Sequence, residues 1–307
     1  MAASDFASTP AVTRRAQARL GVLLVAPLMV LVSLFFLIPL GSAIYFSLVD
    51  FHGFEADPPF IGLANFVELA NDRAVWPALR NNIIWIIVGT AAPLVIGLLV
   101  AVMLWNVGRG STFYRLAFFL PYILPAAAIG VVWSWIYDPI RGWLNLGLEI
   151  VGLGSLATGW LGDPRTALGA ILVTAVWTST GFVVVIFLAA LRNVDVELID
   201  AATIDGANAA QRLWSVILPQ IMPVFLMVTT ITLIGGFAVF DIVFVMTGGG
   251  PAGATEVLGT YAYSSAFQLN RMSYGTALAL VITLLAIPFA IGLNRLQRRL
   301  SLYRTGA

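Results

Sequence analysis

The stretch Asp195-Val-Glu-Leu-Ile-Asp200-Ala-Ala-Thr-Ile-Asp205-Gly206-Ala-Asn208 is a polar island in an otherwise apolar sequence. It lies between uncharged runs that end at Leu191 and begin again at Leu213. Asp195 is of a residue type that caps helices, and Gly206 permits a turn that a side chain would hinder. The island therefore predicts a structured loop, with a short helix before Gly206 and a second over about 209–216. A short helix lying on lipid headgroups is the simplest alternative interpretation.

The rest of the sequence is dominated by long uncharged runs. Of its 307 residues, 60% are hydrophobic and only 10% are charged, whereas soluble domains carry about a quarter charged residues. About 20 apolar residues are enough for a helix to cross a bilayer. We therefore predict an all-α polytopic membrane protein with six transmembrane helices. The expected spans are about 21–49, 81–106, 116–137, 167–191, 219–246 and 273–294.

The basic residues are all arginine, and their distribution predicts an orientation. With a cytoplasmic N-terminus, eleven of the 16 arginines fall in cytoplasmic segments and five in outer loops, which is the bias that inward-facing loops show. Both termini and the polar island are therefore expected in the cytoplasm. The predicted division is a cytoplasmic tail over 1–19, a transmembrane domain over 20–294 with a cytoplasmic loop over 192–218, and a cytoplasmic tail over 295–307.

The composition also excludes several kinds of chemistry. The chain has no cysteine, no lysine and a single histidine, His52, so thiolate metal sites and cysteine nucleophiles are ruled out. A nucleotide-binding P-loop needs a lysine that reaches the phosphates. We therefore expect no catalytic residue, no metal site and no bound cofactor in this chain.

Four sequence patterns in order resemble one family. Asp200-Ala-Ala-x-x-Asp205-Gly206-Ala, followed by Ile217-x-Pro219, is similar to the EAA loop of ABC importer permeases. The other three resemble the carbohydrate-uptake group of that family. They are Ile61-Gly-Leu-x-Asn65-Phe, then Arg115-x-x-x-Phe119-Leu-Pro121-Tyr122 with Trp133-x-Trp135, then Met246-Thr-Gly-Gly-Gly-Pro251 with Tyr261-x-Tyr263. The resemblance covers about residues 20–300 and implies a type I ABC importer permease fold.

The resemblance also implies a role for the polar island. In that family the loop forms a coupling helix that docks into a cleft on the ATPase subunit. The residues that this assigns to ATPase coupling are Glu197, Asp200, Ala201, Ala202, Asp205 and Gly206. The family usually has Glu where this chain has Asp200, which keeps the charge on a side chain one methylene shorter.

A substrate path through the membrane is the second implied site. Aromatic rings and hydroxyl groups suit sugars, and polar residues within spans often mark a pathway. The candidates are Tyr122, Trp177, Thr178, Ser179, Phe182, Thr232, Gly236 and Asp241. Asp241 is expected deep in the fifth span, where it either lines a cavity or marks a hydrogen-bonded tie to a neighbouring helix or a kink. Thr178 and Ser179 either face the path or bond their own helix backbone.

These patterns together predict the permease subunit of an ATP-driven importer for a sugar or sugar-like solute, such as an oligosaccharide, a disaccharide or a glycerol phosphate derivative. Expected partners are a second related permease, two ATPase subunits that bind ATP and Mg²⁺, an extracytoplasmic solute-binding protein and membrane lipid, with no nucleic acid. The expected location is a bacterial or archaeal cytoplasmic membrane. The alternatives are an ABC permease for another solute class and a proton-coupled secondary transporter that uses Asp241. The glycine run at 248–250 is interpreted either as a turn or as a contact for the binding protein or a gate.

Overall fold

The computed structural model describes residues 11–53, 55–105 and 111–305, and the regular structure within these ranges is helical. A single isolated bridge between Val49 and Phe60 is the one extended pairing among them. The predicted all-α class is confirmed. The longer helices are α1 (Ala11–Val32), α2 (Ile38–Ser47), α4 (Val75–Trp105), α5 (Ser111–Ile123), α6 (Ala126–Ile136), α8 (Ala167–Leu191), α11 (Leu218–Phe237) and α14 (Met272–Thr305). The shorter ones are α3 (Ala64–Asn71), α7 (Trp143–Ile150), α9 (Val196–Ile204), α10 (Ala209–Arg212), α12 (Asp241–Met246) and α13 (Leu258–Tyr263).

Five segments of the described chain are long and apolar enough to cross a bilayer as single helices. They are Arg19–Ser47, Val75–Trp105, Ala167–Leu191, Ala209–Phe237 and Met272–Arg298. The third predicted span, 116–137, is instead the pair α5 and α6, bent by 98° at a short break. Pro125 lies in that break as the residue before α6, and a proline lacks the N–H for a helical hydrogen bond and disfavours helix in the residue before it.

The fifth predicted span, 219–246, is also divided. α11 ends at Phe237, and α12 begins after a break at Phe240, whose φ and ψ are −150° and −63°. The Asn82 side chain of α4 donates a hydrogen bond to the Gly236 carbonyl at 3.2 Å. This bond satisfies a carbonyl that the end of α11 leaves without a helical partner.

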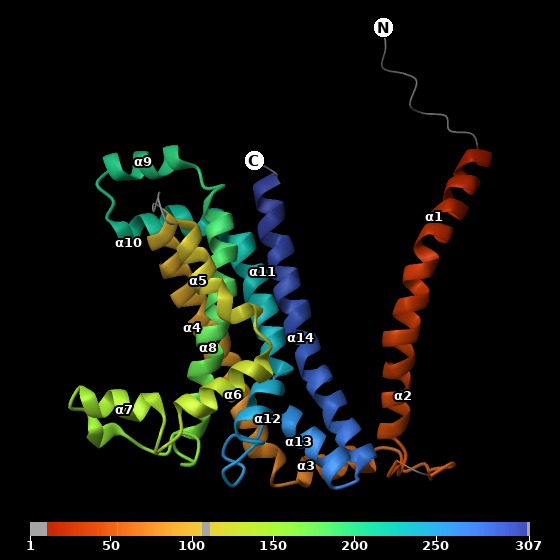
Figure 1. Cartoon of the computed structure of the whole chain (residues 1–307). Coiled ribbons are helices and arrows are strands. Elements are labelled where there is room, and N and C mark those ends of the chain that lie inside the picture. The colour runs from red at the N-terminus through yellow and green to blue at the C-terminus, as the bar shows by residue number, and fades with distance from the viewer. Residues whose placement is uncertain (1–10, 54, 106–110, 306–307) are drawn as a thin grey trace.

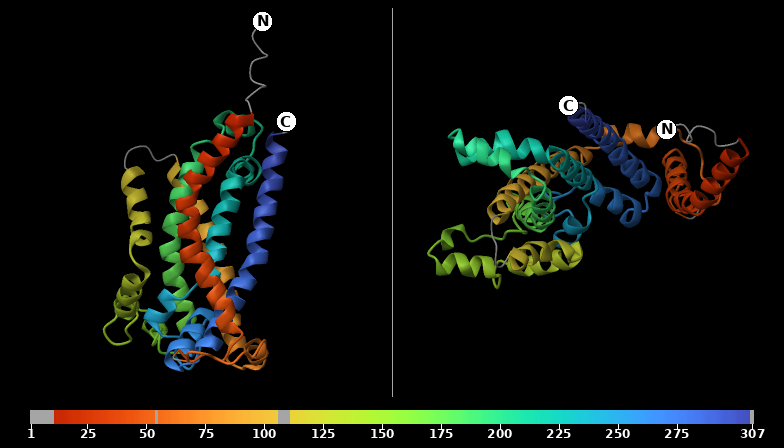
Figure 2. Two further views of the ribbon diagram at one scale, coloured as in Figure 1. Left: turned by 90° about the vertical axis from the view of Figure 1, so that its right-hand side faces the viewer. Right: turned by 90° about the horizontal axis from the view of Figure 1, so that it is seen from above.

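α8 is the centre of the bundle and packs against α4, α5 and α11 (Figures 1 and 2). Two of its contacts are unusually close. A Cβ added to Gly97 of α4 would lie 2.6 Å from the Val183 side chain, and one added to Gly181 would lie 1.8 Å from the Phe118 carbonyl oxygen of α5. Glycine at these positions therefore sets the distance between neighbouring helices.

The first span stands apart from this bundle (Figure 1). Its most apolar window is 0% buried within the chain, and α2 contacts the bundle along α14. α1 begins at Ala11 and α14 continues to Thr305, so helix extends into both segments predicted as tails. Residues 1–10 and 306–307 of those tails lie outside the described ranges.

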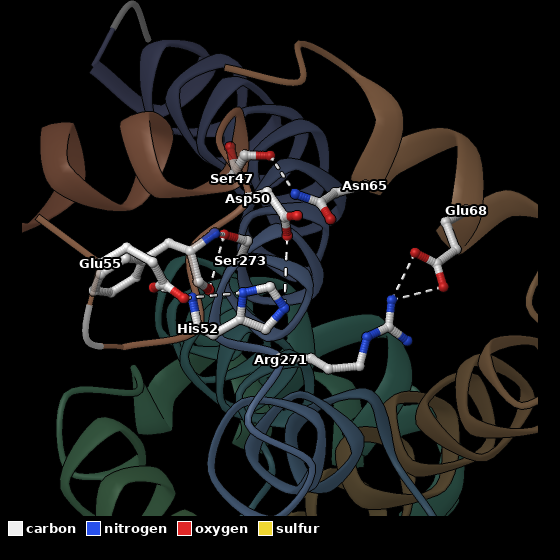
Figure 3. A network of polar contacts seen from close by, with 9 residues as sticks. Ser47, Asp50, His52, Glu55, Asn65, Glu68, Arg271 and Ser273 are labelled. Carbon is white, nitrogen blue, oxygen red and sulfur yellow. Dashed lines mark hydrogen bonds and ion pairs between the residues drawn. The ribbon is translucent and has the colours of Figure 1, made fainter. Parts of the chain in front are cut away.

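Polar contacts fasten the chain at the end of the bundle opposite α9 (Figure 3). The Asn65 side chain donates to the Ser47 carbonyl at 2.9 Å, and the Arg271 guanidinium pairs with Glu68 at 2.6 Å. Asp72 accepts hydrogen bonds from the hydroxyls of Tyr261 and Tyr274. Burial alone would raise the pKa of Asp72, but these bonds hold that pKa below its ordinary value. Segments 189 to 203 residues apart in the sequence are thereby joined at this end of the bundle.

Candidate functional site

A cavity of about 370 Å³ lies between α4, α5, α8, α11 and the start of α12. Its lining residues are Trp85, Gly89, Tyr122, Ala126, Ala175, Thr178, Ser179, Phe182, Ile231, Thr232, Gly235, Gly236, Ala238, Val239, Phe240, Asp241 and Ile242. The lining is mainly apolar and aromatic with a few polar groups, which is the usual make-up of a small-molecule site.

Seven of the eight predicted path residues line this cavity, although they come from four separate helices. The exception is Trp177, which lines a second hollow, of about 710 Å³, between α4, α5 and α8. Its ring packs edge-on against Trp133 and is 46% exposed. Adjacent residues of a helix project about 100° apart, so Trp177 and Thr178 belong to different faces of α8.

The hydroxyl groups in the cavity wall donate hydrogen bonds to the backbone of their own helices. Thr178 donates to the Thr174 carbonyl at 2.9 Å, Ser179 to the Ala175 carbonyl at 2.6 Å, and Thr232 to the Val228 carbonyl at 3.0 Å. The backbone-bonding interpretation of the Thr-Ser patch is confirmed. A role for these residues in a substrate path stays a prediction, although their side chains line the cavity. Each oxygen keeps acceptor capacity for a hydroxyl of a bound molecule.

Aromatic rings form the other part of the wall. Tyr122 of α5 and Phe182 of α8 stack with centroids 4.8 Å apart and planes 23° apart. The sequence did not identify two further lining rings, Trp85 and Phe240. Nothing local distinguishes Trp85 from the other tryptophans, because its place in the wall depends on how α4 packs against α11.

Asp241 is not deep within a spanning helix, which corrects the expectation from the sequence. It is the first residue of α12, after the break that ends α11, and its side chain is exposed and lines the cavity. A carboxylate in the first turn of a helix is favoured by the positive end of the helix dipole. No described residue forms an ion pair with it.

The polar island forms the loop α9–α10 at the other end of the bundle (Figure 1). The Asp195 side chain caps α9 by accepting from the Glu197 N–H at 2.9 Å, and Gly206 has φ +82°. The predicted cap, first helix and glycine turn are confirmed. The second predicted helix consists of α10 and one π-helical turn, Leu213–Ile217, which continues into α11.

The island is held rigidly but presents an open face. The Arg212 guanidinium donates to Thr203 and to the Ala207 carbonyl, both at 3.2 Å, and the Asp195 N–H donates to Gln220 of α11 at 2.9 Å. The apolar side chain of Ile204 is nonetheless 86% exposed. Of the six predicted coupling residues, Glu197, Asp200, Ala201, Asp205 and Gly206 are exposed and Ala202 is half-buried.

The glycine run at 248–250 lies within a compact turn. Thr255 donates to the Gly250 carbonyl at 2.6 Å, and the Asn81 side chain of α4 donates to the Ala254 and Glu256 carbonyls at 3.0 and 2.8 Å. The half-buried Glu256 carboxyl lies where a Gly249 side chain would be, and burial raises its pKa. The turn interpretation is confirmed, whereas a contact with a binding protein stays a prediction.

Helices long and apolar enough to cross a bilayer, a cavity among them and an exposed helical loop at one end are the features expected of a membrane transport subunit. Residues 93–302 match the family model described as the binding-protein-dependent transport system inner membrane component, and the chain belongs to that family. It is therefore a permease of the ABC importer type, as the sequence predicted.

Individual relatives agree along most of the chain. A probable ABC transporter permease of Bacillus subtilis, YurN, is 34% identical over 260 residues, which is 84% of this chain and 89% of the relative. The trehalose/maltose permease MalF of Thermococcus litoralis is 30% identical over 275 residues, which is 90% of this chain and 92% of the relative. A solved bacterial ABC transporter for alginate import has a similar fold, with a TM-score of 0.80 at 21% identity over 94% of this chain and 98% of that chain.

Proposed function

We propose that this chain is one of two permease subunits that together form the pathway of an ATP-driven importer for a carbohydrate. The direct connection between the cavity and the exposed island carries the proposal. α8 presents Thr178 and Phe182 to the cavity and ends four residues before Asp195. α11 follows the loop in the chain and contributes Thr232 and Gly236 to the cavity wall. A displacement of α9 is therefore transmitted to two cavity walls by continuous helices.

The partner at α9 is a separate ATPase, present in two copies in the complex and binding ATP and Mg²⁺. The absence of lysine removes the P-loop that this chain would need to bind nucleotide itself. α9 offers exposed acids beside an exposed apolar residue, Ile204. Apolar contact supplies affinity and charge supplies orientation in such contacts. The chain itself is a transport subunit and not an enzyme.

The cargo is a sugar. Hydroxyl oxygens and aromatic rings converge in one cavity, so a sugar can donate hydrogen bonds to Thr178 and Ser179 and lay its C–H face on Tyr122 or Phe182. No basic side chain is present among the described lining residues, and Asp241 is the one acid. An anionic sugar would therefore meet the Asp241 carboxylate and no cation on this chain's side of the pathway, which favours an uncharged one. Relatives named for trehalose/maltose and diacetylchitobiose uptake support this class.

A second permease closes the pathway, and an extracytoplasmic binding protein delivers the cargo. No residue in the most apolar window of the first span is buried within its own chain, which leaves room for a partner permease or lipid. The described ends of α1 and α14 lie at the same end as α9 (Figure 1). This supports the arginine-based orientation, with both termini in the cytoplasm of a bacterium or archaeon.

The ATPase contact is tested by photo-crosslinking. The chain contains no cysteine, so Ala201→Cys gives one attachment point on α9 for a benzophenone maleimide. We expect a crosslinked product with the ATPase subunit of the co-expressed complex. Gly147→Cys is the matched control, because it is exposed on α7 at the opposite end, and it should give none. Equal yields at the two positions, or no product at either, would contradict the proposed coupling role.

The cargo site is tested by removing two cavity hydroxyls. The double variant Thr178→Val with Ser179→Ala keeps the packing volume and should lower uptake by about tenfold, since a hydrogen bond contributes about 0.5–1.5 kcal/mol. Thr180→Val is the control, because its hydroxyl bonds the Val176 carbonyl at 2.6 Å and its side chain lines the other hollow. Unchanged concentration dependence of uptake in the double variant would remove these residues from the path.

A further inference from the structure

α7 carries an exposed apolar face that neither the cavity nor the island explains. Trp143, Leu146 and Ile150 are spaced as one helical stripe and are 79%, 54% and 76% exposed. Ile140 before the helix and Val151 after it are exposed as well. An apolar patch of this kind on a protein surface marks an interaction site.

The face is built rigidly. Asn145, on the buried side of α7, donates to the carbonyls of Pro139 and Thr158 at 3.1 and 3.0 Å and accepts from the Trp160 indole at 2.7 Å. Leu144 also packs inward, against the core that contains Tyr137. Because the side of α7 that carries Leu144 and Asn145 is fixed to the protein, the apolar stripe faces away from the bundle.

The position of α7 identifies what covers it. α7 lies at the edge of the bundle, across the direction of the spanning helices and at the end opposite α9 (Figures 1 and 2). Val132 and Trp135 of α6 are exposed as well, and with Trp143 they line a hollow of about 350 Å³ between the two helices. The charged side chains of Asp138 and Arg141 line the same hollow, as suits a surface at the boundary between acyl chains and headgroups. α6 belongs to the bent pair that is apolar enough to span a bilayer.

We propose that α7, with Ile140 and Val151, is an interfacial anchor that lies at the headgroup boundary of the bilayer at the end of the bundle opposite α9. Amphipathic helices that lie in this plane place tryptophan and aliphatic residues in the acyl boundary and charged residues toward water. Trp143 and Glu149 match that division. A soluble partner that docks and leaves would expose the apolar stripe to water in each cycle, whereas lipid covers it throughout. The inference requires only that the chain spans a bilayer.

The test uses a nitroxide label on single cysteines in the cysteine-free chain, assembled with its partner subunits in phospholipid nanodiscs. Ile150→Cys is the test position, and Glu149→Cys is the matched control because it lies one residue away on the flank of the stripe. We expect the label at 150 to collide several-fold more with oxygen than with water-soluble nickel chelate, and the label at 149 to show the reverse preference.

Three results would overturn the anchor. Nickel accessibility at 150 equal to that at 149 would place the stripe in water. Protection of 150 from both reagents in the complex, lost when the chain is reconstituted alone, would identify the second permease as the cover. Immobilisation of the label only after the solute-binding protein is added would identify that protein instead.

Discussion

Gly181→Ala should destabilise the protein and abolish transport. The new Cβ would lie 1.8 Å from the Phe118 carbonyl oxygen and 2.8 Å from its carbon, both backbone atoms of α5. A backbone cannot rotate away as a side chain can, so α5 and α8 must separate. Overpacking of this kind costs about 1–3 kcal/mol or more. The separation would also displace Tyr122 from Phe182, whose stacked rings form the cavity wall.

The matched control for this variant is Gly169→Ala on the same helix. No atom lies within 4 Å of a Cβ added there, and alanine is favoured over glycine within a helix by about 1 kcal/mol. The free energy of unfolding should therefore fall in Gly181→Ala and rise in Gly169→Ala. Thermal unfolding of the complex in nanodiscs and uptake by proteoliposomes measure the two effects. Equal stability of the two variants would show that the α5–α8 contact is not as close as the structure has it.

Asp200→Arg should reduce uptake to background, because it reverses a charge on the face of α9 proposed to bind the ATPase. Asp200 is exposed and forms no ion pair with a described residue, so the substitution should leave the fold intact. A like-charge contact in a docking site weakens binding strongly. Copurification of the ATPase and cargo-dependent ATP hydrolysis should fall with uptake.

Asp200→Glu separates charge from side-chain length in the same assay. It restores the residue usual in the family and should keep uptake at or above the level of the unaltered chain. If Asp200→Arg retained both ATPase binding and uptake, the coupling assignment of α9 would be wrong. Low uptake by Asp200→Glu as well would mean that length, and not charge, governs the contact.

The local features of the island could be predicted from the sequence because they depend on neighbouring residues. Asp195 caps the helix that it precedes, and Gly206 takes the positive φ that its turn needs. The break between α5 and α6 was not predicted, because proline occurs both at bends and within continuous helices. Pro27, Pro93, Pro223 and Pro288 all lie inside continuous helices, so proline alone does not show where a span bends.

The residues that line the cavity could likewise be predicted only in part from the sequence. The family resemblance and the polar residues within spans together indicated seven of its lining positions, yet they also indicated Trp177, which lines another hollow, and missed Trp85. Asp241 was expected deep in a continuous span because the uncharged run around it is nearly continuous, whereas the structure places it at the start of α12, after a break. Which face of a helix looks into a cavity depends on its neighbours in space.

The sequence by itself determined that this chain crosses a membrane as helices and carries a capped, exposed loop between two of them. Apolar runs in lipid have to satisfy their backbone hydrogen bonds locally, and the helix does so. The tertiary structure alone decided where two spans break and which side chains share a cavity. Asn82 illustrates the reason, because its side chain bonds both the Gly236 carbonyl and the Leu258 N–H. Those partners are more than 150 residues away in the sequence, so no local pattern could bring them together.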